Sequence, residues 1–402
     1  MNKKKFVLDS LFNMVAMAIP ILVLQLFTLP FLGFRLGEDD YGMVVTLISL
    51  YTLLSFPFGN VLNNIRLLFD EEYKKEELSG DFNVLLSTSF VLSILLMLVG
   101  MIFYVNQSSI LDIVLMLIIT GLNLLREYLV VAFRIKLNFK AIMYNNYILG
   151  LGYVYGTYLF YVTGIWQFIF ILGFGFSLIY IIKNSDLILE PYVKTRLFKK
   201  TTYNSVILLL SSLLGNLLTY ADKLLIFPLL GPKAVSIYYA STLIGKLSSM
   251  VITPINGVIL SYLAKLEMIT MKTFFKILCI TGVVGVIGYV LSILISPFVL
   301  HLLYPIWATE SLDYILVTTA TAIVGIVSTV VQPFILKFTH MNWQLVINGS
   351  NVMVYVFFSI LLYQQFGLMG FCIGILISSI YQLVLMIGIF IFNNKKQIHK
   401  SA

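Results

Sequence analysis

Residues 83–105 read NVLLSTSFVLSILLMLVGMIFYV, a run that holds no charged side chain. An α-helix needs roughly 20 apolar residues to cross a hydrocarbon core of ~30 Å, because each residue adds ~1.5 Å. Backbone amides in lipid must be hydrogen-bonded within their own segment, so a run of this length is expected to be helical. Similar runs recur along the whole chain of 402 residues, of which 60% are hydrophobic. The sequence therefore predicts an all-α membrane protein.

About twelve of these runs are long enough to span a bilayer. The predicted spans are residues 10–32, 43–63, 83–105, 111–133, 144–163, 166–182, 204–229, 236–260, 274–296, 312–334, 344–363 and 368–392. The connections between them are short, and the longest, 64–82 and 183–203, are too small for a folded catalytic domain. We therefore expect no enzyme activity and no cofactor.

The net charge of +8 follows from membrane topology. With a cytoplasmic N-terminus, Lys and Arg gather in the segments that lie inside, while Arg35 and Lys233 lie outside. This asymmetry is what the positive-inside rule requires. It predicts an even number of spans in the cell membrane, both termini in the cytoplasm, and no nucleic-acid partner.

The two cysteines, Cys279 and Cys372, stand in apolar runs without a partner at disulfide or metal-ligand spacing. We expect them to pack against neighbouring helices, and we expect no metal site. The chain also lacks a phosphate-binding glycine loop and a nucleophile elbow.

A repeat relates the two halves of the chain. The segment Leu36-Gly37-Glu38-Asp39-Asp40-Tyr41-Gly42 follows the first span, and Leu230-Gly231-Pro232-Lys233-Ala234-Val235-Ser236-Ile237-Tyr238-Tyr239 follows the seventh. Both consist of Leu-Gly, a polar turn, and a tyrosine that opens the next helix. Pro57 then matches Pro254, and Thr163-Gly164-Ile165 is echoed by Phe366-Gly367-Leu368.

Six spans in each half, an even number, give the two halves the same orientation in the membrane. We therefore predict two parallel-related six-helix bundles around a central cavity, with the substrate site between the repeats. The predicted domains are an N-terminal bundle at 1–182, a basic cytoplasmic linker at 183–203 and a C-terminal bundle at 204–402.

The sequence resembles the polysaccharide flippases of the multidrug/oligosaccharidyl-lipid/polysaccharide exporter superfamily, through the turn at 36–42, its echo at 230–239, and Tyr220-Ala221-Asp222-Lys223. The resemblance extends over nearly the whole chain in length, helix count and two-lobed arrangement. It implies alternating access through a V-shaped cavity between the lobes. It also implies flipping of a polyprenyl-pyrophosphate-linked oligosaccharide across the cytoplasmic membrane for capsule or other surface polysaccharide biosynthesis. Membrane lipids, a polysaccharide polymerase and glycosyltransferases are the implied partners.

Charged side chains within the spans are the main candidates for function, because each costs about 2.5–3.5 kcal/mol to insert. Arg126 and Glu127 lie in the fourth span, ~10 Å from its inner end. Adjacent side chains on a helix do not face each other, so we expect no direct pair between these two. Arg126 is predicted to bind a phosphate through its planar fork of donors. The alternative is that both residues form structural pairs with neighbouring helices.

The seventh and eighth spans form a hairpin that carries three more charges. Asp222 and Lys223 lie ~10 Å below the outer end of the seventh span, and Lys246 lies ~15 Å deep in the eighth. We predict an Asp222–Lys246 ion pair that acts as a clamp or a gate, and a substrate-binding role for Lys246. Lys223 has the alternative of extending to the outer interface.

Arg66 follows the second span at the cytoplasmic mouth, where an entering headgroup would meet it. We predict a substrate-binding role, although a basic residue at an inner helix end also satisfies topology.

Four other classes of protein share some of these features. A multidrug or cation antiporter of the same superfamily would use a carboxylate in the first span, but Asp9 lies only at its start. Facilitators of the major facilitator type carry a Gly-rich Asp-Arg pattern after the second span, which is missing. A glycan polymerase or glycosyltransferase would need a large acidic loop, and 297–312 is small. A membrane subunit of a glycan polymerase complex stays an open alternative.

Overall fold

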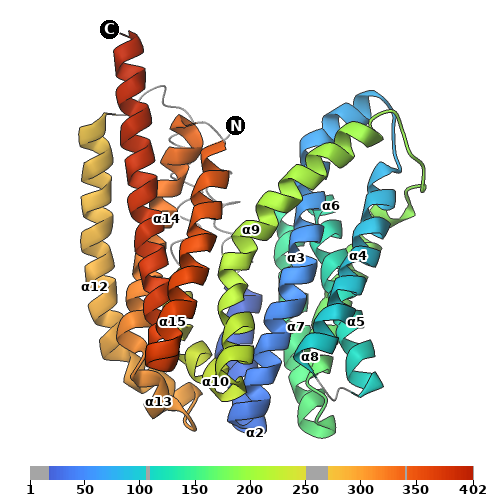
Figure 1. Ribbon diagram of the computed structural model, residues 1–402. Coiled ribbons are helices and arrows are strands. Elements are labelled where there is room, and N and C mark those ends of the chain that lie inside the picture. The colour runs from blue at the N-terminus through green and yellow to red at the C-terminus, as the bar shows by residue number, and fades with distance from the viewer. Residues whose placement is uncertain (1–17, 106–108, 250–269, 340–341, 402) are drawn as a thin grey trace. The chain divides into compact units, whose positions relative to one another are not determined.

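The structure is a computed structural model (Figure 1), and the residues it describes are 18–105, 109–249, 270–339 and 342–401. These residues form helices and turns without a strand, so the all-α prediction is confirmed for them. Pro254 and the predicted span segments 10–17 and 250–260 lie outside the described residues.

The helices gather into two compact units, and neither unit is continuous in sequence. Unit 1 holds residues 18–32 and Thr46–Leu224, and unit 2 holds Gly33–Val45 and the described residues from Leu225 onward. Helices α3 (Glu38–Lys75) and α9 (Phe198–Leu230) each contribute residues to both units. The predicted domain boundaries at 182 and 204 stay a prediction.

Unit 1 is an assembly of packed helices. Beside its parts of α3 and α9 it contains η1 (Val23–Thr28), the start of α2 (Leu29–Leu36), α4 (Asp81–Tyr104), α5 (Ile110–Leu129), α6 (Val131–Ile135), α7 (Phe139–Thr163), α8 (Gln167–Lys183) and η2 (Leu187–Leu189). Helix α8 packs against both α5 and α7, and η1 packs against α7.

Unit 2 is a smaller set of helices. It contains α10 (Pro232–Ser241), a helical stretch at 243–249, α12 (Met271–Leu303), α13 (Ala308–Leu312), α14 (Ile315–Phe338) and α15 (Asn342–Ser401). Helix α14 lies beside α12 and α15 (Figure 1). Phe274, Phe334 and Phe390 belong to a hydrophobic core of this unit. The rings of Phe274 and Phe390 stack with their centres 4.2 Å apart.

Eight helices among the described residues are long and apolar enough to cross a membrane, which makes the chain a multi-pass membrane protein. Two of the predicted spans, 344–363 and 368–392, lie within α15 and are divided by a kink at Gly367. Helix α8 is apolar but shorter, with 17 residues. The predicted span 144–163 lies in α7, a helix with many tyrosines that is not among the eight.

The glycines of the repeated turns share a positive φ. Gly37 and Gly231 adopt φ values of 81° and 86°, a region that glycine enters without steric cost. Gly164 and Gly367, from the second match, have φ values of 76° and 55°. All four glycines therefore lie at helix breaks or kinks where the repeat predicts a turn.

Within unit 2 the two Leu-Gly turns contact each other. Ser236 Oγ donates a hydrogen bond to the carbonyl oxygen of Glu38. The ammonium of Lys233 lies 2.8 Å from the Glu38 carboxylate and 3.0 Å from that of Glu310. The hydrogen bonds that the Lys233 ammonium donates to these two carboxylates raise the pKa of Lys233. Behind the turns, Tyr41 is fully buried and shares a hydroxyl–hydroxyl hydrogen bond of 2.9 Å with Tyr304.

Candidate functional site

Unit 1 contains a cavity of about 580 Å³ in which two predicted site residues meet. Arg126, Glu127 and Arg134 are the charged residues of its lining. Its other polar residues are Asn60, Asn63, Asn64, Asn146 and Tyr153. Two guanidinium groups against one carboxylate give the lining a net positive charge, and asparagine amides supply further hydrogen-bond donors.

Arg126 is held between α5, α7 and α8. Its Nε donates to Ser177 Oγ at 3.3 Å, and its Nη2 lies 3.5 Å from Asn146 Oδ1. Its Nη1 donates to Glu127 Oε1, so the expectation that these neighbours would not pair is wrong. Both side chains are long enough to bend toward each other despite leaving the helix in different directions. The exposed fractions of 14% and 18% place the pair at the cavity wall, largely away from solvent.

Arg134 is a site residue that the sequence reasoning assigned only to topology. Its Nη1 donates to Asn63 Oδ1 and, at 3.0 Å, to Asn64 Oδ1. Asn63 in turn donates to the backbone carbonyl of Glu127 at 2.8 Å. The described residues give Arg134 amide acceptors but no carboxylate, so its charge is not neutralised at the cavity.

A periodic signal in the sequence marks this wall of the cavity. Asn60, Asn63 and Asn64 are spaced three and four residues apart, which places their side chains on one face of α3. Three amides on one face of an apolar helix are a signal of a polar site, because each must find a hydrogen-bond partner in the membrane.

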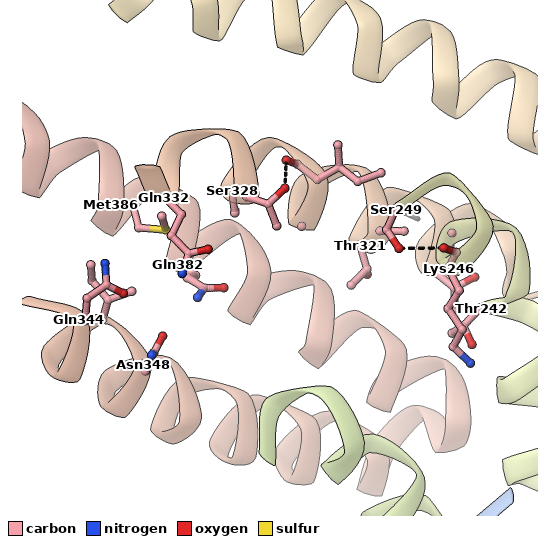
Figure 2. A pocket seen from close by; sticks show the side chains of 17 residues that line it. Thr242, Lys246, Ser249, Thr321, Ser328, Gln332, Gln344, Asn348, Gln382 and Met386 are labelled. Carbon is pink, nitrogen blue, oxygen red and sulfur yellow. Dashed lines mark hydrogen bonds between the residues drawn. The ribbon is translucent and has the colours of Figure 1, made fainter. Parts of the chain in front are cut away.

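Unit 2 contains a second polar cavity, of about 360 Å³. Lys246 lies at one end of it, and the amides of Gln332, Gln344, Asn348 and Gln382 lie at the other (Figure 2). The ammonium of Lys246 is 3.6 Å from the ring centre of Tyr239, a close cation–π contact. The placement of Lys246 in a cavity agrees with its predicted substrate-binding role, which stays a prediction.

One face of α14 forms the length of the unit 2 cavity. Thr318, Thr321, Ser328, Thr329 and Gln332 all line it. Their spacing follows the helical period, so the sequence itself carries the signal of this polar stripe. Gly245 allows the helix that carries Lys246 to come close to α14, since a Cβ there would lie 2.4 Å from the Cβ of Ala322.

Arg66 lies outside the linings of both cavities. It forms a two-pronged ion pair with Glu190, in which its Nη1 donates to Oε2 at 2.8 Å. The guanidinium also lies 4.6 Å from the ring centre of Phe82. In the structure Arg66 therefore joins α3 to the segment after η2, and its substrate role stays a prediction.

Asp222 and Lys223 are both buried in α9. The Lys223 ammonium donates to Asp222 Oδ1 and, at 3.2 Å, to the backbone carbonyl of Thr219. Lys223 is therefore buried beside Asp222, and the alternative that it extends to the outer interface is wrong. The proposed Asp222–Lys246 pair would join unit 1 to unit 2 and stays a prediction.

The chemistry of both cavities is that of binding. Their linings hold guanidinium, ammonium, amide and hydroxyl groups, which recognise anions and hydroxyl-rich molecules. Among the residues that the structure describes, no cluster of His, Cys, Asp and Glu could hold a metal ion.

Comparison with solved structures identifies the fold. The eukaryotic MATE transporter AtDTX14 has a TM-score of 0.65 at 15% identity, covering 98% of this chain and 97% of that chain. An outward-facing multidrug resistance MATE family transporter of the MOP superfamily has a TM-score of 0.61 at 13% identity, covering 96% and 94%. The lipid II flippase MurJ, in an inward closed conformation, has a TM-score of 0.60 at 13% identity, covering 89% of each chain. No family model and no curated protein matches the sequence.

The chain thus has the fold of the MOP superfamily transporters, in two helical bundles, over almost its full length. Identities of 13–15% establish the fold alone. This is the fold that the resemblance read from the sequence implied, whereas membership of the superfamily and of its polysaccharide flippase branch stays a prediction.

Proposed function

We propose that the protein is a flippase that moves a polyprenyl-pyrophosphate-linked oligosaccharide from the inner to the outer leaflet of the cell membrane. The observation that supports this most directly is the unit 1 cavity, with Arg126 and Arg134 at its wall and a single carboxylate beside them. Arginine binds phosphate oxygens with two parallel hydrogen bonds, and these are strongest where water is excluded.

The energetic need for such a site is large. A diphosphate that enters hydrocarbon without partners loses its hydration, at a cost of tens of kcal/mol in the limit of an isolated ion. Cationic and amide donors within the membrane replace that hydration. The polyprenyl tail stays in lipid, and only the headgroup has to be carried.

A multidrug or cation antiporter is the second candidate, because MATE transporters share the fold. Its substrates would be cations that need acidic or aromatic partners. The lining of the unit 1 cavity carries a net positive charge, and the lining of the unit 2 cavity includes Lys246 but no acidic residue. Both linings therefore favour an anionic or neutral substrate over a cation.

The test is flipping by the full chain in proteoliposomes, with a synthetic undecaprenyl-pyrophosphate-linked sugar and an impermeant lectin that reports its arrival. We expect the double variant Arg126→Ala/Arg134→Ala to lose at least tenfold in flipping rate, which corresponds to about 1.4 kcal/mol. Arg196→Ala is the matched control, because Arg196 is 70% exposed and pairs with Glu76 away from the cavity.

If the double variant inserts normally and flips the substrate at the wild-type rate, Arg126 and Arg134 are not required for flipping. Efflux of an organic cation by the wild type, without flipping of the glycan, would favour the antiporter.

A further inference from the structure

We propose that the unit 2 cavity binds the uncharged, hydroxyl-rich sugar portion of the transported glycan. This assignment rests on the proposed function and deepens it, since it gives the two cavities different ligands. Phosphate recognition belongs to unit 1, and sugar recognition belongs to the amide-lined cavity of unit 2.

The hydroxyl groups that line the unit 2 cavity already donate their protons to the protein backbone. Each of its six Ser and Thr hydroxyls donates a hydrogen bond to a backbone carbonyl, at distances of 2.7–3.0 Å. These residues are Thr242, Ser249, Thr318, Thr321, Ser328 and Thr329. A hydroxyl whose proton is used in this way still offers lone pairs. The walls therefore present acceptors to whatever occupies the cavity.

Acceptor-rich walls discriminate between ligands. A phosphate or another anion brings acceptors of its own, which hydroxyls that already donate to the backbone do not match with a proton. A sugar brings several hydroxyl donors, and each can be matched by a Ser, Thr or amide oxygen. The unit 1 cavity differs in charge, because the guanidinium groups of Arg126 and Arg134 outnumber the one carboxylate in its lining, that of Glu127.

The amide end of the cavity supplies donors for the oxygen atoms of the same ligand. Gln344 Nε2 is buried and has no hydrogen-bond partner among the described residues. A buried donor without a partner costs about 1–3 kcal/mol, so a ligand oxygen at this position would relieve that cost. Gln332 and Gln382 reach the same end from α14 and α15 (Figure 2).

The size of the cavity suits a sugar. From Thr318 to Gln332 its wall follows α14 for ~21 Å, by the rise of an α-helix. Its volume of about 360 Å³ lies at the lower end of the range for small-ligand pockets. Lys246 lies at the end away from the amides (Figure 2).

The experiment uses the full chain in lipid nanodiscs that are free of glycoside detergents, which would themselves compete. Saturation-transfer-difference NMR measures the binding of glucose, galactose and N-acetylglucosamine, and ³¹P line broadening measures the binding of inorganic pyrophosphate. The variant is Gln344→Leu, and Gln382→Leu serves as a second variant should the first fail to fold. Gln364→Leu is the matched control. It makes the same chemical change on α15, but Gln364 is exposed and lies outside this cavity.

We expect at least one of the three sugars to bind the wild type and the control. We expect the apparent Kd of that sugar to rise about tenfold in Gln344→Leu or Gln382→Leu, because each substitution removes a buried hydrogen bond to the ligand. Pyrophosphate binding should be unchanged in both Gln variants and lost in Arg126→Ala/Arg134→Ala.

Sugar binding that is equal in all variants would overturn the assignment, and so would the absence of any sugar signal from a wild type that binds pyrophosphate. Neither result would affect the proposed function. Sugar binding that depends on Gln344, in a protein that does not bind pyrophosphate, would instead support the sugar site and count against the proposed headgroup.

Discussion

At the scale of single residues, the charge balance of the unit 1 cavity depends on Glu127. Its carboxylate accepts a hydrogen bond from Arg126, and the lining includes no other acidic residue. Glu127 therefore occupies the guanidinium group that a phosphate would otherwise use. A ligand that binds Arg126 has to compete with this internal carboxylate.

We predict that Glu127→Gln binds inorganic pyrophosphate roughly three- to tenfold more tightly, because a neutral amide replaces the competing charge while it can still accept a hydrogen bond. Titration of the purified protein, followed by ³¹P NMR, measures the change. Glu190→Gln is the control, since Glu190 also pairs with an arginine but lies outside the cavity lining. Unchanged affinity in Glu127→Gln would show that this carboxylate does not oppose anion binding.

Sequence reasoning located part of this site. A charge in an apolar run is conspicuous in any sequence, so Arg126 and Glu127 were found. Arg134 was found only as a topological charge, because it stands near the end of a predicted span. Its role at the cavity follows from its hydrogen bonds to Asn63 and Asn64, which are some seventy residues away along the chain.

At the scale of elements, buried polar contacts join the segment after η2 to the C-terminal part of α3 and to the start of α4. Asp81 is fully buried and accepts a hydrogen bond of 2.6 Å from the Thr195 amide and another of 2.6 Å from the Tyr73 hydroxyl. Asn83 donates to the backbone carbonyl of Glu190 at 2.6 Å. The Arg66–Glu190 ion pair lies in the same region, and it joins residues 124 positions apart.

We predict that Glu190→Ala lowers the free energy of unfolding by about 3–5 kcal/mol, because it leaves the charge of Arg66 buried without a partner. The double variant Arg66→Met/Glu190→Leu should recover most of the loss, since it removes both charges. Thermal unfolding of the purified protein measures both effects.

Glu76→Ala is the matched control for this pair. Glu76 pairs with Arg196 between the same two segments, but that arginine is 70% exposed. Its removal should cost no more than about 1 kcal/mol. Equal losses for Glu190→Ala and Glu76→Ala would contradict a buried, energetically important ion pair.

At the scale of the whole molecule, the proposed reaction carries negative charge outward across a membrane that is negative inside. Each charge gains ~2.3 kcal/mol per 100 mV, so two charges on a pyrophosphate gain roughly 4–5 kcal/mol. This driving force requires no chemical ion gradient. Counter-movement of protein charge would reduce it.

We predict that flipping in proteoliposomes depends on the membrane potential. A potassium gradient with valinomycin should raise the initial rate when the substrate moves toward the positive side and lower it when the sign is reversed. The same vesicles with equal potassium on both sides serve as the control. Rates that are independent of the potential, and that change with a proton or sodium gradient instead, would assign the coupling to an ion.

The sequence by itself determined the class of the protein, because the length and apolarity of its runs leave helices as the only structure that satisfies backbone amides in lipid. It also determined the main helix breaks, since Gly37, Gly164, Gly231 and Gly367 lie where the repeat predicts turns and all adopt positive φ. The tertiary structure decided which polar side chains share a cavity. A sequence shows that Asn60, Arg134 or Gln344 lies on a polar face, but which neighbouring helix covers that face depends on packing between segments far apart along the chain. For the same reason only the fold could reveal that Arg66 is matched by Glu190, and that the hydroxyl protons of the unit 2 cavity are already bonded to the backbone.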